Sequence, residues 1–101
     1  GSCNGFSISE AAFSTAESGS CSWNGGNVTI YAGSGNSGYV SVNIVGADGK
    51  TYFSKGKSNW CPVQIGSVYL PPQNYTISIM SGRGGGACST NPNAVVSISA
   101  S

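Results

Sequence analysis

Hydrophobic and polar residues alternate along most of this chain with a period of two, which is typical of β-strands that bury one face. The clearest case is residues 39–44, where Val40, Val42 and Ile44 alternate with Tyr39 and polar residues. Runs of this kind predict strands over residues 6–8, 28–32, 39–44, 51–53, 63–70, 75–79 and 94–98.

Turn-forming residues punctuate these runs. Asp48-Gly49 lies between two strand-like runs and predicts a hairpin, because both residues tolerate a positive φ. Gly66 predicts a break or bulge within its strand. Pro71-Pro72 ends that strand, because proline cannot donate a hydrogen bond to a β-ladder.

The spacing of runs and turns predicts an all-β fold. Six to eight short strands with turn signals about every 8–12 residues are typical of an antiparallel β-sandwich, immunoglobulin-like or jelly-roll-like, or of a small barrel. Leu70 is the only leucine, and the β-branched and aromatic residues that replace it suit strands. Two glycine tracts, 33–38 and 82–86, are expected to be loops, and residues 10–13 fit a brief helical turn or an extended first strand. We expect a single domain over residues 1–101.

Four cysteines and no histidine favour disulfides over a zinc site. Of the three pairings that four cysteines allow, we expect Cys3–Cys21 and Cys61–Cys88. Each bond would contribute roughly 3 kcal/mol in the chain-entropy model. Two disulfides also predict an oxidising compartment, so the chain is expected to be secreted.

Charge is scarce, with four cations, three acids and a net charge of +1. No run of Lys or Arg matches a phosphate backbone or an acidic membrane surface, so neither nucleic acid nor such a surface is an expected partner. No stretch of about 20 apolar residues would span a membrane. The surface must therefore consist largely of hydroxyls, amides and glycine backbone.

The residue types also limit the chemistry. Without histidine, the Ser-His-Asp and Cys-His arrangements are absent. A carboxylate pair would have to come from Glu10, Glu17 and Asp48, and Glu10 and Glu17 share a face only if their segment is helical. A calcium site built on Asp48 and carbonyl oxygens has too few acids around it. An anion cradle at residues 82–86 lacks the GK[ST] ending. We therefore expect a non-catalytic protein with no metal and no cofactor.

The aromatic residues are the most informative candidates for binding. Trp23 and Trp60 lie in polar, loop-like surroundings, each within two residues of a cysteine. Tyr31, Tyr39 and Phe53 lie on the opposite strand parity from the neighbouring Val and Ile residues, which predicts that at least some are exposed. The alternative for Trp23 and Trp60 is that they pack against the disulfides.

Exposed aromatic rings among amides and hydroxyls suit a sugar ligand. The flat C–H faces of sugars stack on Trp and Tyr, while polar side chains bond the hydroxyl groups. The polar candidates adjoin the aromatic ones or lie in a predicted loop. They are Asn24, Asn59 and Arg83.

Two Asn-X-Ser/Thr triplets are candidate glycosylation sites, at Asn27 and Asn74. Each begins a predicted strand, where the asparagine could face solvent. Such triplets also arise by chance in a chain rich in Asn and Thr, so Asn74 is equally a turn residue after Pro71-Pro72.

The chain resembles small carbohydrate-binding modules that are appended to secreted polysaccharide-degrading enzymes. The resemblance lies in the cysteine-bounded β pattern, in Trp next to Asn and Gly, and in residues 68–77, VYLPPQNYTI. This run looks like the leucine–proline–turn–tyrosine–threonine corner of many extracellular sandwich domains, and it indicates architecture rather than sugar binding. The resemblance implies that Trp23 and Trp60 are platform residues.

We therefore expect a monomeric module that binds a polysaccharide of the cellulose, chitin, xylan or β-glucan type. The alternative is a subunit of an extracellular filament, pilus or adhesin, a homopolymer in which residues 5–13 add a strand to a neighbouring copy. A secreted inhibitor or toxin-like domain is a third hypothesis, based on size and disulfides alone.

Overall fold

The computed structural model describes residues 1–11 and 16–101. The described part contains eight β-strands and no helix, and hence no helix that could cross a membrane. The strands are β1 (Phe6–Glu10), β2 (Glu17–Trp23), β3 (Gly26–Gly33), β4 (Val40–Gly46), β5 (Thr51–Lys57), β6 (Val63–Leu70), β7 (Gln73–Ser81) and β8 (Ala94–Ala100).

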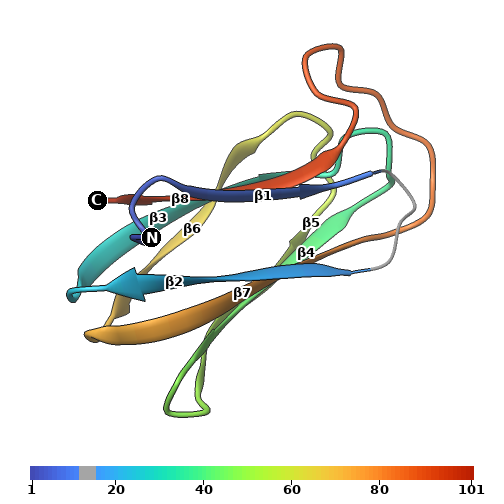
Figure 1. Cartoon of the computed structure of the whole chain (residues 1–101). Helices are drawn as coiled ribbons and strands as arrows, with labels where there is room; N and C mark the ends of the chain where they lie inside the picture. Colours follow the sequence, from blue (N-terminus) through green and yellow to red (C-terminus); the bar gives the residue numbers. More distant parts are fainter. Residues whose placement is uncertain (12–15) are drawn as a thin grey trace.

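The strands form two four-stranded antiparallel sheets that pack face to face (Figure 1). Sheet I has the order β1-β8-β3-β6, and sheet II has the order β2-β7-β4-β5. Every pairing within each sheet is antiparallel. This is the predicted all-β, disulfide-bonded sandwich.

The core lies between the sheets and consists of the inward-facing members of the alternating runs. On β4, Val40, Val42 and Ile44 are fully buried, and the residues between them are partly exposed. The same alternation holds on β7, where Tyr75, Ile77 and Ile79 point inward. Branched aliphatic side chains on strands of period two therefore produce the core as the sequence predicts.

Both predicted disulfides form, Cys3–Cys21 and Cys61–Cys88. Cys3 and Cys21 are buried in the core cluster, whereas Cys61 is exposed and only its partner Cys88 is buried. Disulfides of this kind are typical of oxidising compartments.

The turn end of the sandwich consists of three tight connections, residues 24–25, 47–50 and 71–72, and both chain termini lie beside it (Figure 1). The hairpin between β4 and β5 has a three-residue loop, 47–49, because the Gly46 N–H donates to the Lys50 carbonyl oxygen and the Gly49 N–H donates to the Gly46 carbonyl oxygen. Gly49 has a φ of 84° and takes the left-handed position that such a loop needs. The hairpin was predicted correctly, with one more residue in its loop than the Asp-Gly pair suggested.

The predicted corner at residues 70–76 also forms. The Tyr75 hydroxyl donates to the Pro71 carbonyl oxygen four residues upstream. Leu70 ends β6 in sheet I, and Gln73 begins β7 in sheet II, so this bond fixes the chain where it crosses between the sheets. The predicted irregularity at Gly66 is present as a register shift between β3 and β6.

The structure adds to the sequence analysis in several segments. β2 was not predicted, because its sequence ESGSCSW buries only Cys21 fully and lacks an apolar alternation. Of the three aromatic residues of which at least some were expected to be exposed, Tyr31 and Tyr39 are exposed, and Phe53 is buried because it pairs with the inward-facing Ile44 next to a register shift in the β4–β5 ladder. Of the segment 10–13, Glu10 extends β1, and residues 12 and 13 lie outside the described residues.

Candidate functional site

The loop end of the sandwich, opposite the turn end, consists of residues 34–39, 58–62 and 82–93 (Figure 1). Backbone hydrogen bonds join these loops to one another. The Ser34 N–H donates to the Asn59 oxygen (2.7 Å), and the Gly35 N–H donates to the Trp60 oxygen (2.8 Å). The Asn36 N–H donates to Pro92 (3.0 Å), and the Cys61–Cys88 disulfide links the second and third loops. The loop end is therefore a connected structure.

Two exposed aromatic rings at the loop end rest on glycines of the tract 82–86. A methyl group on Gly82 would overlap the Tyr39 ring, and the backbone N–H of Gly82 donates to the backbone carbonyl oxygen of Tyr39 (2.8 Å). A methyl group on Gly86 would lie 2.6 Å from Cδ1 and 2.7 Å from Nε1 of Trp60. Tyr39 and Trp60 nevertheless remain 44% and 51% exposed. Each ring is thus supported on one side by backbone and open to solvent elsewhere.

Close backbone approach is the reason why these positions must be glycine. Between Gly82 and Gly86 the chain also passes Gly38, where a methyl group would lie 2.5 Å from the Arg83 oxygen. Larger residues would push the tract away from the loop that carries Tyr39. The sequence analysis predicted a loop here, but no short-range pattern indicates which aromatic ring a glycine will face.

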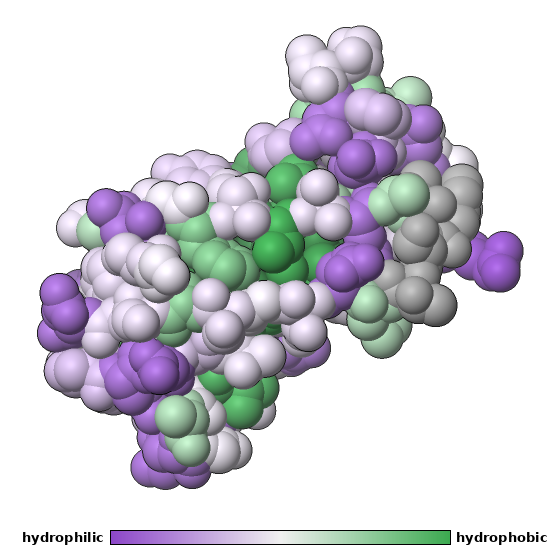
Figure 2. Space-filling view, viewed as in Figure 1, coloured by the Kyte–Doolittle hydropathy of each residue, from purple (hydrophilic) through white to green (hydrophobic). Residues whose placement is uncertain are grey.

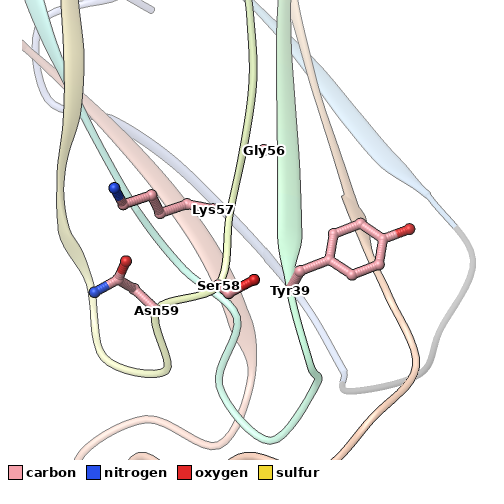
Figure 3. Close-up of a pocket in the computed structure, with 5 residues that line it drawn as sticks. All are labelled: Tyr39, Gly56, Lys57, Ser58 and Asn59. Carbon is pink, nitrogen blue, oxygen red and sulfur yellow. The ribbon is translucent and has the colours of Figure 1, made fainter.

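A shallow open hollow of about 410 Å³ lies beside Tyr39 and is lined also by Gly56, Lys57, Ser58 and Asn59 (Figure 3). The Lys57 and Asn59 side chains point to one side of β5, whereas the Tyr39 ring points to the other side. The polar groups therefore do not converge on one enclosed point, as they would in a pocket for a small molecule. The arrangement suits a ligand that lies across an open surface.

The structure divides the seven predicted sugar-binding residues into three places. Four are at the loop end, namely Tyr39, Asn59, Trp60 and Arg83. Trp23 and Asn24 are at the turn end, where Trp23 is half-buried against the core and its Nε1 donates to the Gly26 oxygen (3.2 Å). Tyr31 is apart from both groups, on the outer face of sheet I.

Sequence reasoning did not select Tyr69, which is 56% exposed and lies on the same outer face as Tyr31. The signal was available, since Tyr69 lies between Val68 and Leu70 and so has the opposite strand parity from these core residues. It was masked by the corner motif that begins at Leu70.

Asp48 belongs to a network of polar hydrogen bonds at the turn end. Its Oδ1 accepts the Lys50 N–H (3.0 Å), and its Oδ2 accepts the Tyr52 hydroxyl. These bonds, that of Tyr52 first, hold the pKa of the Asp48 carboxyl below its usual value of 3.8. The same bond, with a smaller contribution from burial, raises the pKa of Tyr52 above 10.0. Asp48 is therefore engaged in the hairpin on both oxygens.

Gln73 connects that hairpin to the corner. Its side-chain oxygen accepts the Asp48 N–H (3.0 Å), and its Nε2 donates to the hydroxyls of Tyr52 and Tyr75, each at 3.3 Å. The Tyr52 and Tyr75 rings meet edge to face at 5.5 Å. The turn end is thus joined by side chains as well as by tight turns.

The other carboxylates do not form a pair on a helix, since Glu10 ends β1, buried, and Glu17 begins β2, exposed. Within residues 1–11 and 16–101, no three Cys, Asp or Glu side chains gather into a group that could hold a metal ion. The two candidate glycosylation sites, Asn27 and Asn74, are both exposed, and each is the second residue of its strand, β3 and β7 respectively.

No protein-family model matches the chain, and no curated protein matches it significantly in sequence. The functional argument therefore depends on the geometry of the residues.

Proposed function

We propose that this protein is a secreted, non-catalytic module that binds a polysaccharide through the aromatic residues of its loop end. The observation that carries the proposal is the pair Tyr39 and Trp60, each held against a glycine and each about half exposed. Exposed aromatic side chains of this size are candidates for recognition rather than for core packing.

The chemistry of the surroundings fits a sugar. Aromatic faces attract the C–H faces of sugar rings, and the amide of Asn59 and the guanidinium of Arg83 offer donors for hydroxyl groups. Because Gly82 and Gly86 already fix the two rings, binding costs little side-chain entropy. An open surface of this kind suits a polymer better than an isolated small molecule.

The test is retention of the purified protein on insoluble cellulose, chitin, xylan and β-glucan. We expect one of these polymers to retain the protein, and Trp60→Ala and Tyr39→Ala to release it. Met80→Ala is the matched control, because Met80 is as exposed as Trp60, at 51%, but lies on the outer face of sheet II. Absence of retention on every polymer, or equal loss in the Met80 variant, contradicts the proposal.

Assembly into a homopolymer is the second candidate, and one observation favours it. The facing edges of β1 and β2 are not paired with each other, and Figure 2 shows apolar surface in the middle of the molecule, in the region where Figure 1 draws these strands. Phe6 and Ile8 of β1 are half-buried and pack against the core. An added strand could pair with such an edge.

In this structure residues 6–10 belong to the chain's own sheet I. They pair with β8 along its length, with Phe6 opposite Ile98 and Glu10 opposite Ala94. Light scattering of the purified protein separates the two candidates. A protein that stays monomeric at high concentration supports the binding-module proposal. A protein that polymerises with increasing concentration and is retained by no polysaccharide supports the filament-subunit candidate.

A further inference from the structure

The outer face of sheet I carries a second row of exposed aromatic residues. We propose that Tyr31 and Tyr69 on this face continue the loop-end site, so that the ligand is an extended, uncharged, linear polysaccharide that runs from Trp60 along β3 and β6. This inference rests on the function proposed above and names the class of polymer.

The register of β3 and β6 places both tyrosines on one face. Tyr31 pairs with Gln64, and Asn27 pairs with Tyr69. Tyr31 and Asn27 are four residues apart on β3, so the two tyrosines are separated by roughly 13 Å along the strands. Both side chains are exposed, at 37% and 56%. A ligand that touches both must be longer than a single sugar ring.

The surface between the tyrosines is polar and uncharged. Thr29 and Ser67 pair directly with each other there, and their parity matches that of the tyrosines. The neighbouring strand β8 presents Ser97 opposite Tyr31 and Ser99 opposite Thr29. Hydroxyls and amides with no charge complement a neutral, hydroxyl-bearing chain.

The row also leads to the loop end. Trp60 precedes β6 by three residues, and Gln64, the partner of Tyr31, is the second residue of that strand. A chain bound at Trp60 that follows the strand direction would therefore meet Tyr31 first and Tyr69 last.

A second copy of the protein is a weaker match for this face. Stable protein interfaces have apolar, closely packed centres. Here serine and threonine separate two isolated rings, and the Thr29 hydroxyl is bonded to that of Ser101, so this face has no apolar, closely packed centre.

The experiment measures affinity as a function of chain length by isothermal titration. The probes are the disaccharide and the hexasaccharide of whichever polymer retains the protein, for example cellobiose and cellohexaose for cellulose. For the retained polymer type we expect the hexasaccharide to bind about tenfold more tightly, which corresponds to one added aromatic contact.

Tyr69→Ala should remove this tenfold gain without changing disaccharide binding, and Tyr69→Phe should keep it. Met80→Ala again serves as the control on the opposite face. Near-uniform affinity across chain lengths with no effect of Tyr69→Ala overturns the inference and leaves the proposed function standing. Absence of any binding that depends on Trp60 overturns both.

Discussion

The two ends of this sandwich are held together in different ways. At the turn end, short connections, side-chain hydrogen bonds and a buried disulfide act together, and Asp48, Gln73 and Tyr75 are bonded to neighbours. At the loop end, longer loops are joined by backbone hydrogen bonds, glycine contacts and a partly exposed disulfide. Backbone-mediated cohesion leaves the side chains Tyr39 and Trp60 free to face solvent.

The difference separates stability from function. Side chains that bond one another at the turn end are unavailable to a ligand. The loop end keeps its shape through backbone hydrogen bonds, glycine contacts and one disulfide, so that its aromatic side chains are free for recognition. Substitutions at the turn end should therefore alter the free energy of unfolding, and substitutions at the loop end should alter the positions of the Tyr39 and Trp60 rings.

The largest expected effect comes from the disulfides. Replacing either pair by serine should lower the free energy of unfolding by about 3 kcal/mol. Mild reductant should open Cys61–Cys88 first, because Cys61 is exposed while Cys3 and Cys21 are both buried. Alkylation of the new thiols followed by peptide mapping gives the order. Earlier opening of Cys3–Cys21 would contradict the comparison of the two ends.

Tyr75→Phe should have the next largest effect. The Tyr75 side chain is buried and its hydroxyl bonds Pro71 and Gln73, so the variant leaves polar groups without a partner and costs about 1–3 kcal/mol. Urea unfolding followed by circular dichroism measures this loss. Tyr69→Phe removes the hydroxyl of an exposed tyrosine and should be nearly neutral. A similar loss in both variants would mean that the corner bond is not important.

Gly86→Ala should displace the Trp60 ring at a cost of about 1 kcal/mol, since the added methyl group would meet the ring and the Ser37 oxygen. In a Trp23→Phe background, Trp60 is the only tryptophan and its fluorescence reports the change. Gly85→Ala is the control within the same tract, because a methyl group there has nothing within 4 Å. Identical spectra for both variants would show that Gly86 does not support the ring.

The smallest expected effect is the pH dependence of the turn end. The pKa of Asp48 is lower in the folded state than its usual 3.8, so its stabilising contribution is present above that value and is lost as the pH falls through the folded pKa. The pKa of Tyr52 is raised above 10.0, so its contribution is lost as the pH rises through the folded value.

Asp48→Asn should therefore flatten both limbs of a plot of thermal midpoint against pH. Tyr52→Phe removes the strongest bond to Asp48 and should flatten the acid limb in the same way. An unchanged acid limb in both variants would show that this hydrogen bond contributes no measurable stability.

The sequence predicted those parts of the structure that depend on local patterns. Alternation located β4 and β7, and the prolines and Tyr75 located the corner. β2 escaped detection because its pairing with β7 stabilises a segment of serine and glycine that has no pattern of its own. Tertiary pairing overrides weak local preference in such segments.

The candidate site was harder to predict than the fold. Parity predicted that at least some of Tyr31, Tyr39 and Phe53 are exposed, but it could not single out Phe53 as buried, because a register shift in the β4–β5 ladder is invisible in a single sequence. Trp23 and Trp60 have similar neighbours in the sequence but lie at opposite ends of the molecule. Which residues meet at the loop end depends on strand order, and that order follows from contacts between distant segments.

The position of the chain ends determines how the protein should be attached to a surface or a probe. Ser22 donates to the Gly1 oxygen, and the Ser101 N–H donates to the Asn27 oxygen, so both ends flank the same turn (Figure 1). Either attachment directs Tyr39 and Trp60 away from the support. Asn27 pairs with Tyr69, however, so a bulky group at the carboxyl end would crowd the far end of the tyrosine row. Sensor measurements on long chains should therefore use the amino end.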